Sequence, residues 1–366
     1  MEISIIGLPK SGKTTIFNAL TRGRAEVTAY APTTLAPNVG VSKVPELRLQ
    51  ALAKIFQPKK ITPAEVKYVD IAGIAKGFGK SEGISGQFLN YVSNADALLQ
   101  VVRAFEDENI PHIEGSIDPK RDIATMDLEL IFSDLAMIER RLERLEVSLK
   151  DPKPSERDPH MREQALLQKI KSGLDKDIPI WQQGLTTEEI KSLASYQFLT
   201  AKPMLVVINI GENQLAQAPS LEVKMRSAYS HPQFEIAALC GKLEMELTQL
   251  NDAEAEEFRN ALGLPEPALD RIIKLSYQLL GLISFFTTVS AELKAWTIPK
   301  GTTALKAAGK IHSDIEKGFI RAEVVSFHDL DRCGSLAEAR KQGLLRLEGK
   351  TYIVQDGDII TFLFNI

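Results

Sequence analysis

Eight residues near the N-terminus have the types and spacing of a phosphate-binding loop. The segment Gly7-Leu8-Pro9-Lys10-Ser11-Gly12-Lys13-Thr14 matches G-x-x-x-x-G-K-[ST], between a predicted buried strand at 3–6 and a helical pattern at 15–20. Glycines allow backbone N–H groups and the helix N-terminus to face an anion. We therefore expect Lys13 to bridge the β- and γ-phosphates of a nucleotide and the Thr14 hydroxyl to ligate Mg²⁺.

A second element downstream carries an acidic group. Residues 65–73 are predicted to form a strand that ends in D-x-x-G, with Asp70 and Gly73 at the fixed positions. Asp70 can hold Mg²⁺ through water, and the Gly73 amide can sense the γ-phosphate. In the loop between the two motifs, one hydroxyl of Thr33-Thr34 can close over the metal as a switch; the alternative is ordinary loop polarity.

The elements that must position these residues form an alternating pattern. Apolar runs at 97–103, 204–209 and 234–239 predict further strands, and their alternation with helices predicts a mostly parallel sheet. Ligands of such sheets bind at the carboxyl ends of the strands. The segments Asn209-Ile210-Gly211-Glu212 and Cys240-Gly241-Lys242 follow two of these strands, and we expect a nucleotide base to be read there.

Composition excludes several classes of protein. The 366 residues include 44 Lys+Arg and 48 Asp+Glu, a net charge of −4, so a nucleic-acid partner would have to meet a local patch. Two cysteines predict reduced thiols rather than a disulfide scaffold. The chain shows neither a membrane span nor an export signal, which predicts a cytoplasmic protein with no membrane partner.

A helical arm and a small C-terminal domain are also predicted. Apolar residues recur at spacings of three and four between 128 and 149, which predicts a helix with one apolar face. After a proline-containing turn at 150–160, a second apolar stripe follows at Leu167, Ile170 and Leu174. We interpret this as an antiparallel hairpin for a macromolecular partner; a purely structural arm is the alternative. A capping box at 186–189 starts the returning helix.

The C-terminal part changes character after a helical linker at 270–282. Strands are predicted at 296–298, 352–354 and 359–364, with a helix at 304–311 and a turn at 356–357. A local basic patch for RNA could be formed here, although scattered solvated charge explains the same residues nearly as well; they are Lys306, Lys310, Lys317 and Arg321.

Long segments of the chain resemble the Obg-like ATPase (YchF) family. They include GLPKSGKTTIFNALT, DIAGIAKGFGKSEGISGQFLN, VVRAFEDENIPHIEGSIDP, NIGE and AWTIPKGTTALKAAGKIHSDIEKGFIRAEV, and together they span essentially the whole chain. The resemblance implies an α/β fold: a Ras-like P-loop NTPase domain with an inserted antiparallel helical hairpin (coiled coil) and a C-terminal β-grasp TGS domain. The implied boundaries are 1–124 with 200–280, then 125–199, then 281–366.

The resemblance also implies roles for individual residues. The residues expected to bind the nucleotide are Lys10, Ser11, Gly12, Lys13, Thr14, Thr15, Asn209, Ile210, Glu212, Cys240 and Gly241. The expected metal ligands are Thr14, Thr34 and Asp70, and the expected catalytic set is Lys13, Thr34, Gly73 and His112. Mg²⁺ is the implied cofactor and ATP or GTP the substrate, with K⁺ as a further candidate.

Two departures from GTPase motifs bear on the substrate and the rate. Guanine is usually read by N-K-x-D; here Ile210 replaces Lys, and Glu212 is one methylene longer than Asp, which relaxes guanine reading. The family is known to favour ATP, and we predict that preference. Ile74 stands where Gln orients water in Ras-like GTPases, which predicts slow intrinsic hydrolysis. His112 resembles the family's candidate water-positioning histidine; a solvated loop histidine is the alternative.

Lys10 is a third departure, because the family usually has an Asn there that in related GTPases helps to hold K⁺. A lysine ammonium near that place predicts turnover that depends less on K⁺, unless Lys10 points to solvent.

Taken with these features, the resemblance implies a monomeric, cytoplasmic ATPase that acts as a nucleotide-dependent switch in translation. It would bind the ribosome (50S or 70S) or its rRNA through the arm and the TGS domain. The alternatives are a GTP-preferring Obg-type assembly factor and a nucleotide-stabilised scaffold whose hydrolysis is incidental.

Overall fold

The computed structural model describes residues 1–23, 37–71, 91–150, 154–229, 233–264, 266–289 and 291–365. The chain divides into two compact units. The first contains Met1–Gly40 and Lys67–Pro265, and the second contains Val41–Val66 and Glu266–Ile366. The expected boundaries between domains remain predictions, and the structure adds that residues 41–66 pack with the C-terminal part.

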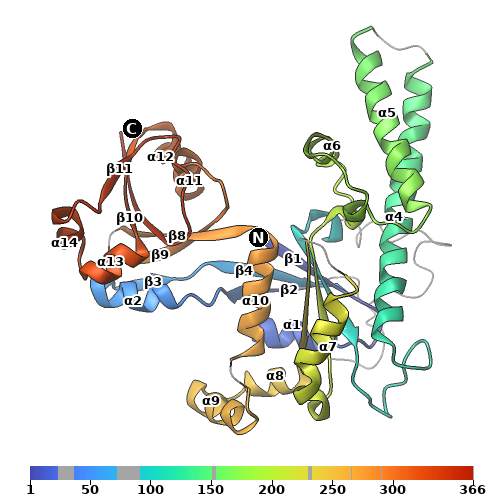
Figure 1. The fold of residues 1–366 in the computed structure, drawn as a ribbon, viewed down its shortest axis with the longest axis horizontal. Helices are drawn as coiled ribbons and strands as arrows, with labels where there is room; N and C mark the ends of the chain where they lie inside the picture. Colours follow the sequence, from blue (N-terminus) through green and yellow to red (C-terminus); the bar gives the residue numbers. More distant parts are fainter. Residues whose placement is uncertain are drawn as a thin grey trace. The chain divides into compact units, whose positions relative to one another are not determined.

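The first unit is built on a six-stranded sheet with the order β2-β4-β1-β5-β6-β7 (Figure 1). Its strands are β1 (Glu2–Ile6), β2 (Asn38–Lys43), β4 (Glu65–Asp70), β5 (Ala97–Arg103), β6 (Met204–Asn209) and β7 (Phe234–Leu239). The pairs β1·β4, β1·β5, β5·β6 and β6·β7 are all parallel, so these strands end at one edge of the sheet. The predicted strands at 97–103, 204–209 and 234–239 are confirmed.

Helices and 3-10 turns cover this sheet and connect its strands. They are α1 (Lys13–Thr21), α7 (Ala218–Arg226), α8 (Gly241–Leu247) and α9 (Asp252–Ala261), with a 3-10 helix at Glu212–Gln217. Fully buried strand residues such as Ile6, Val206 and Ile236 form the centre of the core. Their packing fixes the strand ends from which the site residues project.

The inserted arm consists of two long helices that lie side by side in Figure 1. Its helices are α4 (Pro119–Ser148), α5 (Pro154–Leu174) and the short α6 (Thr187–Leu193), with 3-10 helices at Ile180–Gln182 and Leu199–Ala201. Ile131, Ile138 and Leu145 pack with Leu167 and the other predicted α5 residues in one buried cluster. The predicted hairpin is therefore confirmed, as is the capping box of α6, in which Thr186 and Glu189 bond reciprocally.

The second unit has its own six-stranded sheet, with the order β11-β10-β12-β8-β9-β3. Its strands are β3 (Lys60–Thr62), β8 (Leu282–Val289), β9 (Glu292–Pro299), β10 (Phe319–Ser326), β11 (Arg346–Glu348) and β12 (Asp358–Phe364). Its helices are α2 (Leu47–Phe56), α10 (Ala268–Leu279), α11 (Ala304–Ile311), α12 (Ser313–Lys317), α13 (Phe327–Cys333) and α14 (Leu336–Lys341).

Residues from the N-terminal half complete this second sheet. Strand β3 pairs in parallel with β9, and Thr62 Oγ1 donates a 2.5 Å hydrogen bond to Glu292. Arg48, at the start of α2, bonds Asp356 and lies over the Phe286 ring. These contacts explain why residues 41–66 belong to this unit.

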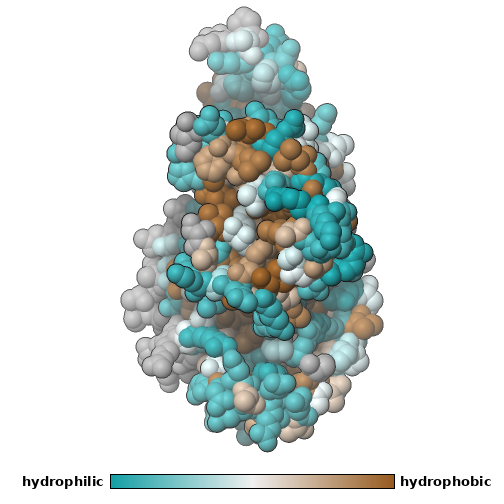
Figure 2. Space-filling view, turned by 90° about the vertical axis from the view of Figure 1, so that its left-hand side faces the viewer, coloured by the Kyte–Doolittle hydropathy of each residue, from teal (hydrophilic) through white to brown (hydrophobic). Residues whose placement is uncertain are grey.

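The second unit carries exposed apolar side chains. Figure 2 shows apolar residues gathered among polar ones on one face. The side chains of Ile320, Leu347, Leu363 and Phe364 are among those exposed.

Two local predictions were wrong. The turn expected at 150–160 is shorter, because α5 already begins at Pro154 and contains Pro159. The strand expected at 352–354 is reduced to a single bridge between Ile353 and Thr303, because the chain turns again at 356–357 before β12. Among the described helices, none is both long and apolar enough to cross a membrane.

Candidate functional site

The loop between β1 and α1 has the backbone geometry of an anion-binding site. Lys10 and Gly12 adopt left-handed conformations, with φ values of 64° and 94°. A Cβ on Gly12 would lie only 2.2 Å from Asn209 Nδ2, so a larger residue could not occupy this position without rearrangement. Gly12 stands at the N-cap of α1 and has no side chain to cap the helix. The first-turn amides are therefore available to an anion.

Lys13 is a buried cation that points back onto this loop. Its Nζ donates to the carbonyl oxygens of Gly7 and Leu8, both at 3.1 Å. Burial lowers the pKa of Lys13 to about 8, although the nearby Asp70 charge opposes the shift. Two neutral carbonyls compensate a buried ammonium incompletely, and a phosphate at this place would supply the missing negative charge.

Thr14 and Asp70 form an oxygen-rich group beside Lys13 that suits a hard cation. Thr14 Oγ1 donates to Asp70 Oδ2 at 2.8 Å, and Asn38 Nδ2 approaches the same oxygen at 3.4 Å. Within the described part of the chain, Asp70 Oδ1 is buried and lacks a hydrogen-bond partner. Burial also raises the pKa of Asp70. An orphaned carboxylate oxygen next to a hydroxyl fits Mg²⁺, which prefers oxygen ligands.

Asn209 braces two loops of the site instead of presenting a free amide to a base. From the end of β6, its Nδ2 donates to the Ser11 carbonyl, and its Oδ1 accepts from the Gly241 N–H, both at 3.0 Å. These two bonds connect the phosphate loop to the start of α8. The sequence predicted the residue, but this arrangement gives it a positioning role.

The other residues expected to read the base lie in different environments. Ile210 and Cys240 are both buried in the core of the first unit, and burial raises the pKa of the Cys240 thiol. Glu212 has a side chain that is 54% exposed and pairs with Lys242 Nζ at 3.4 Å. Of these residues, Glu212 offers a polar side chain at the edge of the sheet.

Lys10, Ser11 and Thr15 complete the predicted phosphate-loop set. The Lys10 side chain is exposed, and Thr15 is half-buried. The Ser11 hydroxyl is buried and lacks a hydrogen-bond partner within the described part of the chain.

Phe105 is a residue of this site that sequence reasoning missed. A Cβ on Gly12 would lie 4.0 Å from its ring, and one on Gly211 would lie 3.8 Å from its Cβ. The guanidinium of Arg103 stacks over the ring, 4.4 Å from its centre. An aromatic residue between the phosphate loop and the 209–212 segment has the place and chemistry to contact a base. Because it lies in a loop after β5, no periodic pattern signalled it.

His112 is buried, and both of its ring nitrogens are bonded. Its side chain is 6% exposed, and Nε2 lies 2.8 Å from Asp122 Oδ2. Nδ1 accepts the Glu114 N–H at 3.1 Å. His112 and Asp122 line a narrow, closely packed pocket together with Leu8, Pro9 and Ser11 of the phosphate loop and the end of β5. The structure thus places His112 beside the loop rather than in solvent.

The remaining predicted residues lie outside the described residues. They are Thr33, Thr34, Gly73 and Ile74, and their roles remain predictions.

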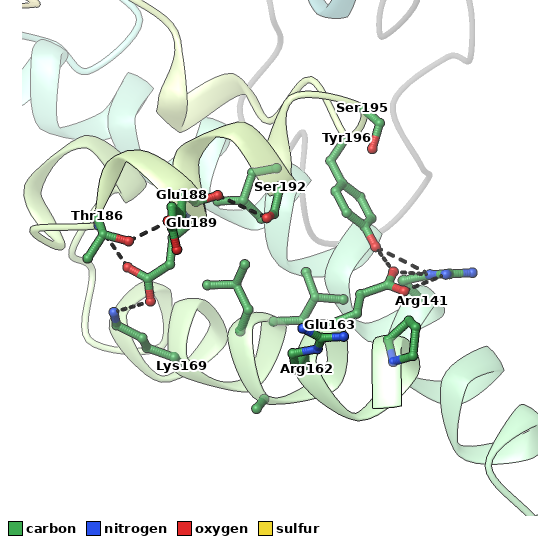
Figure 3. Close-up of a pocket in the computed structure, with 15 residues that line it drawn as sticks. Arg141, Arg162, Glu163, Lys169, Thr186, Glu188, Glu189, Ser192, Ser195 and Tyr196 are labelled. Atoms are coloured by element: carbon green, nitrogen blue, oxygen red, sulfur yellow. Dashed lines mark hydrogen bonds and ion pairs between the residues drawn. The ribbon is translucent and has the colours of Figure 1, made fainter. Parts of the chain in front are cut away.

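A second and larger cavity, of about 1110 Å³, lies on the arm. Figure 3 shows Arg141, Glu163 and Tyr196 bonded to one another at one end of it, and Lys169 paired with Glu189 at the other. Four of its charged groups form these two local pairs, whereas the pocket by the phosphate loop borders buried polar atoms that have no partner among the described residues. We therefore expect the nucleotide to bind at the loop.

Two family models match parts of the chain. Residues 2–139 match a family model described as 50S ribosome-binding GTPase, and residues 282–365 match a YchF-GTPase C-terminal family described as a protein of unknown function. The chain is 42% identical over 368 residues to the ribosome-binding ATPase YchF of Bacillus subtilis, covering all of both chains. It is 41% identical to the protein of the same name from Haemophilus influenzae, covering all of this chain and 99% of that one.

Solved structures agree with these matches. The YchF GTPase of Schizosaccharomyces pombe superposes with a TM-score of 0.85 at 32% identity, covering 99% of this chain and 97% of that one. A GTP-binding protein of Pyrococcus horikoshii has a TM-score of 0.61 at 19% identity, covering all of both chains, and shares the fold.

Proposed function

We propose, from the premise that this chain belongs to the YchF family, that it is a Mg²⁺-dependent ATPase acting as a nucleotide-dependent switch on the ribosome. The observation that carries the proposal is the phosphate site itself. A buried lysine, an uncapped helix N-terminus and a carboxylate oxygen that lacks a partner among the described residues meet at one edge of the sheet. The relatives' names supply the ribosome as the expected partner.

In this proposal each residue of the loop has one task. Lys13 turns from the loop carbonyls to the β- and γ-phosphates, and the backbone amides after Gly12 hold the phosphate oxygens. Thr14 and Asp70, with Thr34, would hold Mg²⁺, which neutralises charge that develops on the phosphates. Gly73 would sense the γ-phosphate through its amide, and His112 would accept a hydrogen bond from the attacking water.

The proposed preference for ATP rests on the ion pair that the Glu212 carboxylate makes. Guanine recognition requires a carboxylate that is free to accept from the ring N–H and the exocyclic amine, whereas Lys242 lies 3.4 Å from Glu212. Asn209 uses both ends of its amide inside the protein. Both observations support a site that selects guanine only weakly. The ring of Phe105 can stack on any base.

The partner surfaces are proposed at the arm and at the C-terminal unit, which we assign as a β-grasp TGS domain. The length of the arm supports its role as a partner surface, because binding a phosphate does not require two long paired helices. Support for the basic patch is weaker, because Lys306 is paired with Glu316 at 2.7 Å. A cytoplasmic monomer is the form that we propose.

Titrations with ATP and GTP in Mg²⁺ test the nucleotide proposal. We expect ATP to bind with a Kd at least several-fold lower than that of GTP, and Lys13→Ala to weaken both by more than tenfold. Lys54→Ala, at an exposed side chain of α2 outside the phosphate loop, is the control and should bind ATP nearly as the wild type does. Tighter GTP binding would favour an assembly GTPase, and binding without phosphate release would favour a scaffold.

A further inference from the structure

The first turn of the arm helix α4 carries a buried carboxylate that bonds the candidate water-positioning histidine. Asp122 is 4% exposed in its side chain, and its Oδ2 lies 2.8 Å from His112 Nε2. Because His112 Nδ1 accepts the Glu114 N–H, the proton of a neutral imidazole lies on Nε2 and is donated to Asp122. The carboxylate therefore selects the tautomer of the ring.

The second oxygen of Asp122 is fixed by another partner. Arg121 donates to Asp122 Oδ1 from Nε at 3.2 Å and from NH2 at 2.9 Å. Arg121 also donates to the hydroxyl and the carbonyl of Ser116. Asp118 caps the helix by accepting from the backbone N–H groups of Lys120 and Arg121. The carboxylate is thus held on both sides and cannot rotate without breaking bonds.

The two bonds of the imidazole differ in strength. The bond to Asp122 joins the ring to a buried charge, and charge-assisted hydrogen bonds are about twice as strong as neutral ones. The bond from Glu114 is an ordinary backbone contact in a loop. Exchange of the Glu114 N–H for a water would leave Nδ1 as the acceptor while Asp122 keeps the ring in place. The lone pair on His112 Nδ1 would then accept a hydrogen bond from that water.

We propose that Asp122 is a positioning residue for ATP hydrolysis, acting through His112. The inference rests on the proposed ATPase function and adds a residue to it. Since Asp122 belongs to the first turn of α4, the orientation of the histidine is tied to the start of the arm. A histidine whose tautomer and orientation are set by a buried carboxylate is a recurrent arrangement in enzymes.

Replacing Asp122 by Asn removes the negative charge and one acceptor oxygen but keeps the volume of the side chain. An asparagine has one acceptor oxygen, whereas Asp122 accepts from both His112 and Arg121, so one of these partners must lose its bond. We expect Asp122→Asn to lower kcat at least tenfold, since a positioned base contributes about 10²–10⁴-fold. The Kd for ATP should stay within twofold of the wild type, because Asp122 is not part of the phosphate loop.

A matched control lies on the same helix. Asp134 is also a buried carboxylate that accepts several hydrogen bonds, but its partners are Leu199 and Thr200. Asp134→Asn should perturb stability without changing kcat of the folded protein. Arg121→Met, at a partly exposed residue, gives a second test should Asp122→Asn not fold, and should lower kcat at an unchanged Kd.

The decisive experiment compares His112→Ala, Asp122→Asn and the double variant in single-turnover hydrolysis, with ¹⁵N NMR of the imidazole in the nucleotide-free protein. The double variant should hydrolyse ATP within twofold of His112→Ala, and the Nε2–H tautomer of the wild type should be lost in Asp122→Asn. Slow hydrolysis by His112→Ala together with wild-type hydrolysis by Asp122→Asn would overturn this inference but not the proposed function. The inference would also fail if the rate losses of the two single variants multiplied in the double variant. A wild type that releases no phosphate would overturn the proposed function as well.

Discussion

Asn209 shows how one side chain can connect two parts of a site. Its two amide groups bond the Ser11 carbonyl and the Gly241 N–H, and the residue is buried. Removing it leaves both backbone groups without partners. A buried polar group without a partner costs about 1–3 kcal/mol.

We therefore expect Asn209→Ala to lower the free energy of unfolding by about 1–3 kcal/mol and to weaken ATP binding. Urea denaturation and nucleotide titration measure the two effects. Asn260→Ala on the exposed face of α9 is the control and should change neither. If the Asn209 variant were destabilised but bound ATP with unchanged affinity, the two hydrogen bonds would serve the fold alone.

Lys10 bears on the dependence on monovalent cations. It combines an exposed side chain with a φ of 64°, a conformation that Asn tolerates better than Lys. An asparagine here would relieve backbone strain and provide an oxygen ligand for K⁺. We expect Lys10→Asn to raise the ratio of turnover in KCl to turnover in NaCl at least threefold above that of the wild type. A wild type already strongly stimulated by K⁺ would contradict the idea that Lys10 substitutes for the cation.

At the scale of elements, Asp134 ties the arm to the chain that returns from it. Its carboxylate, which is fully buried, accepts from the Leu199 and Thr200 N–H groups at 2.8 Å and from the Thr200 hydroxyl at 2.7 Å. Burial raises the pKa of Asp134 to about 6, and the hydrogen bonds only partly oppose this shift. The fold therefore favours the protonated form relative to the unfolded chain.

The sign of the resulting pH dependence follows from the raised pKa. The contribution of Asp134 to stability is fully present below its unfolded pKa of about 4 and is lost as pH rises through about 6. We expect the unfolding free energy of the wild type minus that of Asp134→Asn to fall by about 3 kcal/mol or less over this window. Denaturation curves at pH 4, 5, 6 and 7 measure it, and Asp252→Asn, at a fully exposed side chain, should show no such window. A difference that rises with pH would contradict the assignment.

The sequence predicted elements best where the signal was local. The runs at 97–103, 204–209 and 234–239 are strands with those bounds, because continuous apolar residues between turns suffice to identify a buried parallel strand. The short run at 352–354 failed, since only tertiary context decides whether three apolar residues pair. The association of 60–62 with 292–294 is likewise invisible to a local pattern.

The site was predictable to a similar extent. Lys13 and Thr14 belong to one motif of fixed spacing, and the parallel pairing of β1 with β4 brings Asp70 to them as expected. Phe105 and Asp122 were missed, since a loop residue and a first-turn helix residue have no distinctive spacing. Their roles arise from packing against the phosphate loop, which only the structure reveals.

At the scale of the whole molecule, a switch must bind its partner differently in its nucleotide states. We expect co-sedimentation with ribosomes to differ at least threefold between the protein with a non-hydrolysable ATP analogue and the protein with ADP. Lys13→Ala should show no difference between the two, because it would not hold either nucleotide. Binding that ignores nucleotide in the wild type would favour the scaffold over the switch.

The strand β3 has a consequence for how the chain is made. Its partner Glu292 lies 230 residues downstream of Thr62, and Asp356 lies 308 residues downstream of Arg48. At about 5–20 residues per second of synthesis, residues 41–66 wait roughly 10–50 s before their sheet partners leave the ribosome. During that interval an unpaired strand and helix are exposed on the growing chain. Fragments that start near residue 281 would meet the opposite problem, since they lack the edge strand that completes their sheet.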